Sequence, residues 1–107
     1  MTANQSKDEL YELSYEVHEA FPKWTLDTPW GFTNGELTYS DVYQDFKLLT
    51  SDFLLEKLPK PVGLMSRTDG TQWTAAHQEI FGNADTPLKS LLKLTLALHK
   101  AGELDNA

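Results

Sequence analysis

A line of regularly spaced glutamates is the most distinctive pattern of ionisable residues in this chain. We call it the acidic ridge: it consists of Glu9, Glu12, Glu16 and Glu19, and it is bordered by Tyr11 and Tyr15. Steps of three and four residues bring side chains onto one face of a helix, so the four carboxylates would lie side by side. Such like charges repel one another by roughly 0.2–0.5 kcal/mol per pair. Two interpretations follow, a solvated helix face or an acidic surface that binds a partner.

The histidines do not form a recognisable catalytic or metal-binding arrangement. His18, His77 and His99 are far apart, and none has a second ligand at a spacing typical of a metal site. His77 and Glu79 would share one face of a strand, but alternate strand residues do so by geometry alone. The chain has no cysteine, no nucleophile elbow and no phosphate-binding glycine loop. We therefore expect no catalytic residues, no enzyme activity and no cofactor.

Acidic residues dominate the first half of the chain. Sixteen Asp and Glu against nine Lys and Arg give the 107 residues a net charge of −7. Residues 1–58 hold eleven of these acids and four of the bases, whereas residues 59–107 hold five of each. A metal site built from Asp41, Asp45 and Glu56 would need these carboxylates to converge, and we expect none. Because the net charge repels nucleic acid, we expect no direct nucleic-acid binding.

Composition and hydropathy indicate a folded protein that does not span a membrane. Apolar residues make up 40% and aromatic residues 11% of the chain. These contents are higher than those of disordered segments. No window approaches the ~20 apolar residues of a membrane-spanning helix, and the first residues lack the apolar core of a secretion signal. We expect a single domain over 1–107, with 1–6 and 103–107 frayed. We expect it in the cytoplasm, which is the host cytoplasm if a phage encodes it.

The first predicted element is an amphipathic helix over residues 7–21. Ser6 and Glu9 have the spacing of a capping box, which satisfies free backbone N–H groups at a helix start. Pro22 ends the apolar pattern of the helix. The acidic ridge would lie on the polar side of this helix.

Aromatic residues and turn signals replace the helical period in residues 24–33. We predict one or two short strands there, followed by a turn at Asn34–Gly35, because both turn residues tolerate positive φ. Trp30 lies between Pro29 and Gly31 and is a candidate exposed binding residue. The alternative is an aromatic side chain that fills the core, and it stays open here.

Residues 39–58 regain the helical period. The residues that carry it are Val42, Phe46, Leu49 and Phe53. We predict one kinked helix or two helices in this range, with Ser40 as the N-cap of the first. Asp41 and Asp45 would extend the acidic ridge if this helix lay beside the helix over 7–21.

The second half of the chain is predicted to form a hairpin and a helix. Asp69–Gly70 supplies the turn of a hairpin over 62–80. A helix over 88–101 follows, with a capping segment, Asp85–Pro87, at its start and Gly102 at its end. The order of elements predicts an α+β fold in which a small antiparallel sheet with a C-terminal hairpin packs against about three helices.

The segment Gly82–Leu88 and the apolar helix after it resemble small phage-encoded proteins of the ABA-sandwich type. In those proteins a Trp-containing strand precedes a short loop, an Asp/Glu-Thr-x-Pro-like cap and a terminal apolar helix. Tyr39–Asp41 is similar to a Tyr-Ser-x-Asp stretch of the same proteins, and the resemblance covers residues 37–46 and 62–101. The hairpin and capped helix are also similar to antitoxin domains of the HicB type. Neither resemblance supplies catalytic residues.

Three functions remain open from the sequence. The first is a small acidic phage-type protein that inhibits a host protein with a basic surface, a nucleic-acid-handling or defence-system component, by charge-steered binding. The second is a small-ligand or regulatory module in which Trp24, Trp30 or Trp73 lines a pocket. The third is a self-assembling structural protein that forms a homodimer through 88–101. For the first function, the expected binding residues are the acidic ridge, Tyr11, Tyr15, Asp41, Asp45 and Trp30.

Overall fold

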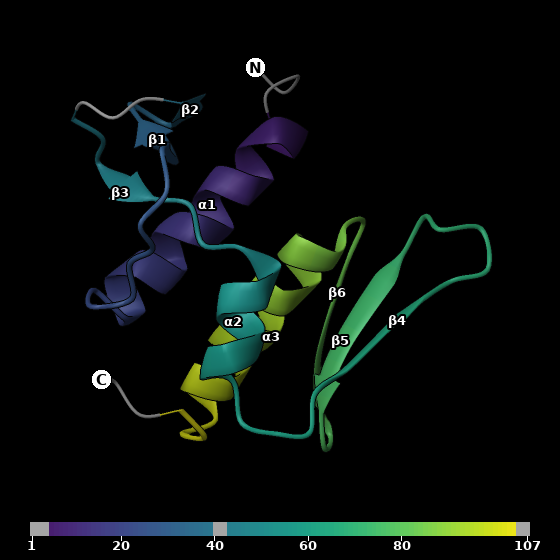
Figure 1. Cartoon of the computed structure of the whole chain (residues 1–107). Coiled ribbons are helices and arrows are strands. Elements are labelled where there is room, and N and C mark those ends of the chain that lie inside the picture. The colour runs from purple at the N-terminus through teal and green to yellow at the C-terminus, as the bar shows by residue number, and fades with distance from the viewer. Residues whose placement is uncertain (1–4, 40–42, 105–107) are drawn as a thin grey trace. The chain divides into compact units, whose positions relative to one another are not determined.

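The computed structural model describes residues 5–39 and 43–104 of the chain (Figure 1). Its elements are, in order, α1 Gln5–Ala20, β1 Trp30–Thr33, β2 Glu36–Tyr39, β3 Phe46–Lys47, α2 Ser51–Lys57, β4 Gly63–Ser66, β5 Trp73–His77, β6 Ile80–Ala84 and α3 Pro87–Lys100. The three helices and the antiparallel strands confirm the predicted α+β fold. The strands form two sheets, in the orders β2-β1-β3 and β4-β5-β6. None of the described helices has the length and apolar character needed to cross a membrane.

The chain divides into two compact units. Unit 1 comprises Met1–Leu49 and holds α1 with the sheet β2-β1-β3. Unit 2 comprises Thr50–Asn106 and holds α2 and α3 with the sheet β4-β5-β6. In each unit a helix contacts its own antiparallel sheet. Whether the units unfold together, as the single domain over 1–107 would require, stays a prediction.

The hairpin β1–β2 of unit 1 is closed by the turn that the sequence predicts. Asn34 and Gly35 have φ of 53° and 84°, and a type I′ turn requires positive values at both central residues. Strand β1 also pairs with β3 on its other side, where Phe32 lies opposite Phe46. The turn therefore sets the register of β2 on one side of β1. Strand β3 occupies the other side.

Aromatic rings pack α1 against this sheet. Tyr11 meets Phe32 edge to face, with the ring centroids 5.6 Å apart, and His18 stacks on Phe46 at 4.9 Å. Phe32 and Phe46 are 2% and 8% exposed. Burial of a side chain of this size stabilises a fold by about 1.5–3 kcal/mol, and aromatic pairing adds to that. These rings therefore form the core of unit 1.

The helix predicted over residues 39–58 is wrong for its first half. Its described residues form no helix: Tyr39 ends β2, Phe46 and Lys47 form β3, and the others belong to no regular element. The predicted N-cap Ser40 lies outside the described residues. Phe46 has the spacing of a helical residue, but it pairs with Phe32, and the Asp45 N–H donates to the Phe32 carbonyl at 2.7 Å. Aromatic residues fit the half-buried surface of a sheet, so this long-range pairing outweighs the local helical period.

The second half of that range is a helix, which corresponds to the second of the two helices considered. The hydroxyl of Thr50 caps α2 by accepting a hydrogen bond from the Phe53 N–H at 3.2 Å. Leu54 and Leu58 are 0% and 2% exposed, and α2 contacts α3. A helix of this length is not stable by itself, so α2 depends on the burial of these leucines.

The hairpin predicted over 62–80 is present as β4 and β5, but its second strand ends earlier than expected. Strand β5 ends at His77, and a further strand, β6, pairs with it antiparallel. Gln78 adopts a positive φ of 57° in the turn between them. A Gln-Glu pair lacks the Gly or Asn that marks such turns, and the sequence analysis therefore did not predict β6.

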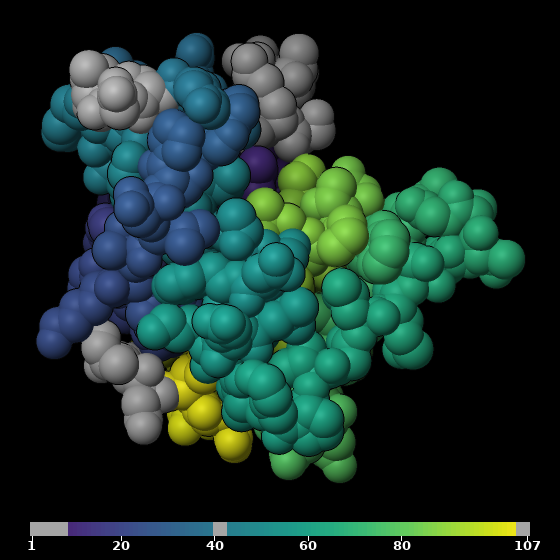
Figure 2. All heavy atoms as spheres, viewed as in Figure 1, coloured from purple at the N-terminus to yellow at the C-terminus, as the bar shows by residue number. Residues whose placement is uncertain are grey.

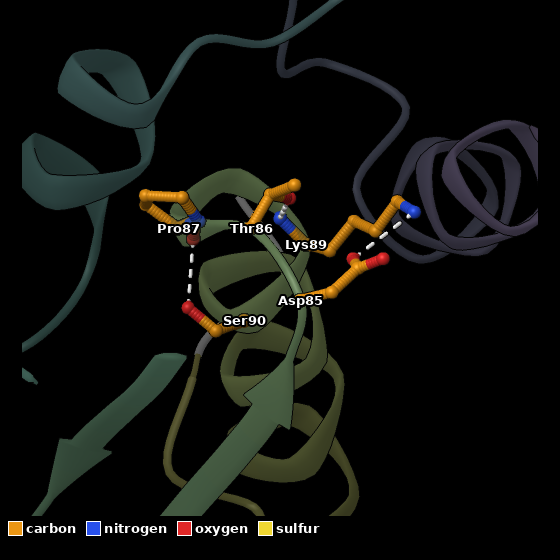
Figure 3. A network of polar contacts seen from close by, with 5 residues as sticks. All are labelled: Asp85, Thr86, Pro87, Lys89 and Ser90. Atoms are coloured by element: carbon orange, nitrogen blue, oxygen red, sulfur yellow. Dashed lines mark hydrogen bonds and ion pairs between the residues drawn. The ribbon is translucent and has the colours of Figure 1, made fainter. Parts of the chain in front are cut away.

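Polar contacts define the start of α3, at the segment that the sequence analysis predicts as its cap (Figure 3). Thr86 is the N-cap, and its hydroxyl accepts a hydrogen bond from the Lys89 N–H at 3.2 Å, with Pro87 following at the first helical position. Lys89 forms an ion pair with Asp85, with Nζ and Oδ1 3.2 Å apart. The Ser90 hydroxyl donates to the Pro87 carbonyl at 2.7 Å.

Helix α3 approaches its sheet most closely above a glycine. The helix buries Leu91, Leu92, Leu94 and Leu98, each at most 1% exposed. Gly82 lies at the centre of β6, and a Cβ added there would come within 2.6 Å of the Leu94 backbone nitrogen. Because glycine has no side chain, the helix and the strand pack backbone against backbone at this point.

A buried hydroxyl on α1 leads to a stability prediction. Ser14 is 7% exposed, and its Oγ has no hydrogen-bond partner among the described residues. Ser14→Ala removes this unsatisfied group and introduces a better helix former, so the free energy of unfolding should rise by about 1 kcal/mol. Urea denaturation measures the change. A fall in stability would show that the hydroxyl is hydrogen-bonded in solution.

Candidate interaction surface

The acidic ridge lies on α1, where its three- and four-residue spacing places it along one side of the helix. Glu12, Glu16 and Glu19 are exposed, and Glu9 is half-buried. No Lys or Arg occurs in the sequence between Glu9 and Glu19. Residues 1–49 contain nine Asp and Glu and three Lys and Arg, so the ridge belongs to the more acidic unit.

The two tyrosines beside the ridge turn towards the sheet of unit 1. Tyr11 is half-buried, and its ring lies 6.0 Å from that of Tyr15 in a stacked arrangement. Tyr15 also approaches Phe46 at 6.1 Å and is 44% exposed. Tyr11 therefore packs mainly within the unit, whereas Tyr15 presents part of its ring to solvent.

Three exposed side chains form what we call the aromatic patch: Trp30, Leu37 and Tyr39. Trp30 lies directly opposite Tyr39 in the register of β1 and β2, and their rings meet edge to face with centroids 4.9 Å apart. Leu37 is two residues from Tyr39, so it lies on the same face of the sheet. The three are 42%, 43% and 67% exposed in chain order. The exposed alternative for Trp30 therefore agrees with the structure.

The aromatic patch shares its face of the sheet with the core of unit 1. Phe32 lies two residues after Trp30 on β1 and opposite Leu37, so its side chain is on the same face, where Tyr11 contacts it. Part of this face is thus covered by α1, and the part that carries Trp30 and Tyr39 is exposed to solvent. Leu37 and Tyr39 were not predicted as binding residues, because the part of the sheet that α1 leaves uncovered depends on contacts between distant segments.

Asp45 serves the local structure of the β1–β2 turn. Its carboxylate accepts hydrogen bonds from the Asn34 N–H at 2.9 Å and from the Tyr43 hydroxyl at 2.8 Å. These two hydrogen bonds lower the pKa of Asp45, so the group stays charged to a lower pH than an ordinary aspartate. Tyr43, whose pKa is raised by the same contact, is 77% exposed. Asp41, the other predicted acid of this segment, lies outside the described residues.

The opposite face of the same sheet is polar, and Gln44 covers it. The Gln44 side-chain amide donates to the Pro29 carbonyl at 3.0 Å and to the Thr38 carbonyl at 3.1 Å. Its Oε1 accepts a hydrogen bond from Lys47 at 3.0 Å. A Cβ on Gly31 would lie 2.5 Å from that Oε1 atom, so the glycine makes room for the amide. Nothing in the local sequence marks Gln44 for this role, and the sequence analysis did not identify it.

The remaining candidates from the sequence lie in the packed interior or apart from each other. Trp24 stacks on Phe21 at 4.1 Å and is 6% exposed. His77 is 5% exposed, and its Nδ1 lies 2.9 Å from the Pro61 carbonyl oxygen, whereas Glu79 lies in the turn after β5. Among residues 5–39 and 43–104, no three His, Cys, Asp or Glu side chains are grouped so as to hold a metal ion.

Unit 1 thus brings together a line of carboxylates on α1 and an exposed aromatic patch on its sheet. Comparison with family models, curated proteins and solved structures found no match for the chain. The charge of the ridge and the exposure of the aromatic patch are therefore the features that point to a function.

Proposed function

We propose that this chain is an acidic interaction protein that binds a basic surface on another protein and blocks it. Unit 1 would supply the binding surface, with the acidic ridge and the aromatic patch as its two parts. The proposed partner is a nucleic-acid-handling or defence-system protein of a host cell, because such proteins carry basic surfaces. The observation that carries the proposal is the exposed edge-to-face pair of Trp30 and Tyr39.

The aromatic patch supports a protein partner. Tryptophan and tyrosine dominate the binding energy of protein interfaces, since their large rings bury much area and lose little conformational entropy. The rings of Trp30 and Tyr39 contact each other at 4.9 Å, and we expect this contact to restrict their rotamers before binding. Pre-ordering reduces the entropy lost on association. Among the residues that the structure describes, five of the seven exposed large hydrophobic side chains lie between residues 15 and 43, in the same acidic unit.

The acidic ridge supports a partner of opposite charge. Glu12, Glu16 and Glu19 are exposed on one helix, and the sequence places no Lys or Arg between them. A one-signed patch of this kind raises the association rate with a basic partner by roughly 10–10³-fold at low salt. Salt at high concentration screens the attraction. The proposal thus requires binding that is strong at low salt and weak at high salt.

The other two functions receive less support. A ligand module would need Trp24, Trp30 or Trp73 to line a pocket, but Trp24 is buried against Phe21, and Trp30 pairs with Tyr39 on an exposed part of its sheet. A homodimer through 88–101 would need exposed leucines, but Leu91, Leu92, Leu94 and Leu98 are buried and the other leucines of α3 are only half-exposed. Binding of a protein by unit 1 remains the proposal that uses the exposed groups.

The test compares two variants of the tagged chain in capture from a bacterial lysate, followed by affinity measurement on the purified partner. In the first variant Glu12, Glu16 and Glu19 are replaced by Gln. We expect the wild-type chain to retain a basic protein at low salt and release it at high salt. The variant should bind that protein about ten- to a hundredfold more weakly, because steering is lost while the helix is unharmed.

The matched control changes the same number of exposed glutamates in unit 2. Glu56, Glu79 and Glu103 are replaced by Gln, which alters the net charge equally. This control should bind like the wild type. Equal weakening in both variants would mean that total charge alone matters, and unchanged binding by the α1 variant would remove the ridge from the proposal. Trp30→Ala then tests the aromatic patch separately, with a loss of about tenfold or more expected.

A further inference from the structure

Strand β4 is an edge of the sheet in unit 2 and is a short strand that lacks the charged residues and prolines that often protect an edge. The sheet order is β4-β5-β6, so only one side of β4 is paired. Its sequence, Gly63–Ser66, contains no charged residue and no proline. Met65 at its centre is 63% exposed. The hairpin of β4 and β5 projects beyond the neighbouring β6 and α3 of the same unit (Figure 2).

The hydrogen bonds of the hairpin reveal which backbone groups of β4 face away from β5. The Arg67 N–H donates to the Gln72 carbonyl at 2.9 Å, so these two residues form a hydrogen-bonded pair. Such pairs alternate along an antiparallel ladder, and Met65 therefore also bonds to β5. The N–H and C=O groups of Leu64 and Ser66 consequently point outward along the open edge.

We infer that β4 pairs with β4 of a second copy of this chain, forming a two-fold symmetric, six-stranded sheet. The outward groups of Leu64 and Ser66 lie symmetrically about Met65. An antiparallel pairing that sets Met65 opposite Met65 of the copy places Leu64 opposite Ser66 in both directions. All four outward groups of each strand then form hydrogen bonds across the interface. A shift of this register leaves some of them without a strand partner.

Side-chain placement favours a second copy in this register. The central Met65 side chains belong to a non-hydrogen-bonded pair, in which side chains approach most closely. Both lie on the sheet face opposite Gly82 and therefore opposite α3, so no helix separates them. Arg67 comes opposite Gly63 of the copy, and no like charges are opposed within the ladder.

The other edge of the sheet does not offer the same complementarity. Strand β6 is flanked by acidic residues, Glu79 before it and Asp85 after it. If β6 paired antiparallel with β6 of a second copy, with Gly82 opposite Gly82, Glu79 of each copy would face Asp85 of the other. Two pairs of like charges would then oppose each other and destabilise the pairing. The charge pattern thus selects β4 as the self-pairing edge.

Sedimentation velocity on the full chain tests the pairing. The ladder is short, so we expect a dissociation constant of about 10–100 µM, and concentrations from about 1 µM to 1 mM span it. The mass should rise from 12.1 kDa towards twice that value. A mass that stays at the monomer up to the highest concentration would overturn the inference. Species larger than a dimer would indicate β4 pairing with β6 of the next copy, which also overturns it.

Charge variants at Met65 test the register. Met65→Lys and Met65→Glu each place like charges opposite one another and should weaken dimerisation at least about tenfold. Because Met65 is exposed, neither substitution should unfold the chain, and circular dichroism of each variant checks this. An equimolar mixture of the two variants should restore the dimer, since Lys then faces Glu. The matched control Phe81→Lys, at a 58% exposed position on β6, should dimerise like the wild type. Failure of the mixture, or an equal effect of Phe81→Lys, would refute this register.

Discussion

Gly82→Ala is expected to lower the free energy of unfolding by about 3 kcal/mol, because it places a methyl group where α3 already contacts the sheet. The added Cβ would lie 2.6 Å from the Leu94 nitrogen and 2.8 Å from the Ser90 carbonyl oxygen. Both are backbone atoms of a helix, so relief requires the whole helix to move away from β6. That movement would loosen the burial of Leu91 and Leu94. Urea denaturation followed by circular dichroism gives the change.

Gly63→Ala is the matched control for this prediction. Gly63 lies on β4 of the same sheet, and a Cβ added there meets nothing within 4 Å. Alanine restricts the unfolded chain more than glycine does, so we expect this variant to be neutral or more stable by up to about 1 kcal/mol. If Gly82→Ala were as stable as Gly63→Ala, α3 would not approach β6 as closely as described.

Phe32→Ala should lower the free energy of unfolding by about 4 kcal/mol, since it removes a ring from the core of unit 1. Phe32 is 2% exposed, and its ring contacts those of Tyr11 and Phe46 at 5.6 Å and 5.2 Å. The substitution loses the transfer free energy of the ring and leaves a cavity between the helix and the sheet. Thermal and urea denaturation measure the effect.

Leu37→Ala is the control for Phe32→Ala. Leu37 lies opposite Phe32 in the β1–β2 register and is 43% exposed, so its truncation should cost less than about 1 kcal/mol. Similar losses for the two variants would contradict the division of this face into a covered and an exposed part. The same control also removes one member of the aromatic patch without disturbing the core.

These variants also test whether residues 1–107 unfold as a single domain. Gly82 belongs to unit 2 and Phe32 to unit 1. Hydrogen exchange of individual backbone amides reports the opening free energy of each region. In a single cooperative domain, either substitution lowers protection in both units by the same free energy. If each substitution affects its own unit alone, the chain holds two domains, and the single-domain prediction is wrong.

Local sequence determined the elements whose signals lie within a few residues. The Asn34–Gly35 turn, the capped start of α3 at Thr86–Pro87 and the hairpin turn at Asp69–Gly70 follow from backbone preferences of those residues. The acidic ridge likewise follows from spacing, because a helix of known period fixes which side chains are neighbours. For such features the sequence alone was sufficient.

Tertiary pairing decided the rest. Phe46 follows the helical period of its neighbours, yet it is in β3 because β1 offers it a strand partner at Phe32. Strand β6 has no turn signal before it and exists through its pairing with β5 and the cover of α3 above Gly82. The turn sets the register of β2, but the exposure of Leu37 and Tyr39 depends on which part of their sheet face α1 covers, and that contact is not encoded in a strand four residues long. Sequence thus determined the turns at Asn34–Gly35 and Asp69–Gly70, the capped start of α3 and the line of charge. Long-range contacts determined which faces are covered, because covering needs a partner that is distant in the chain.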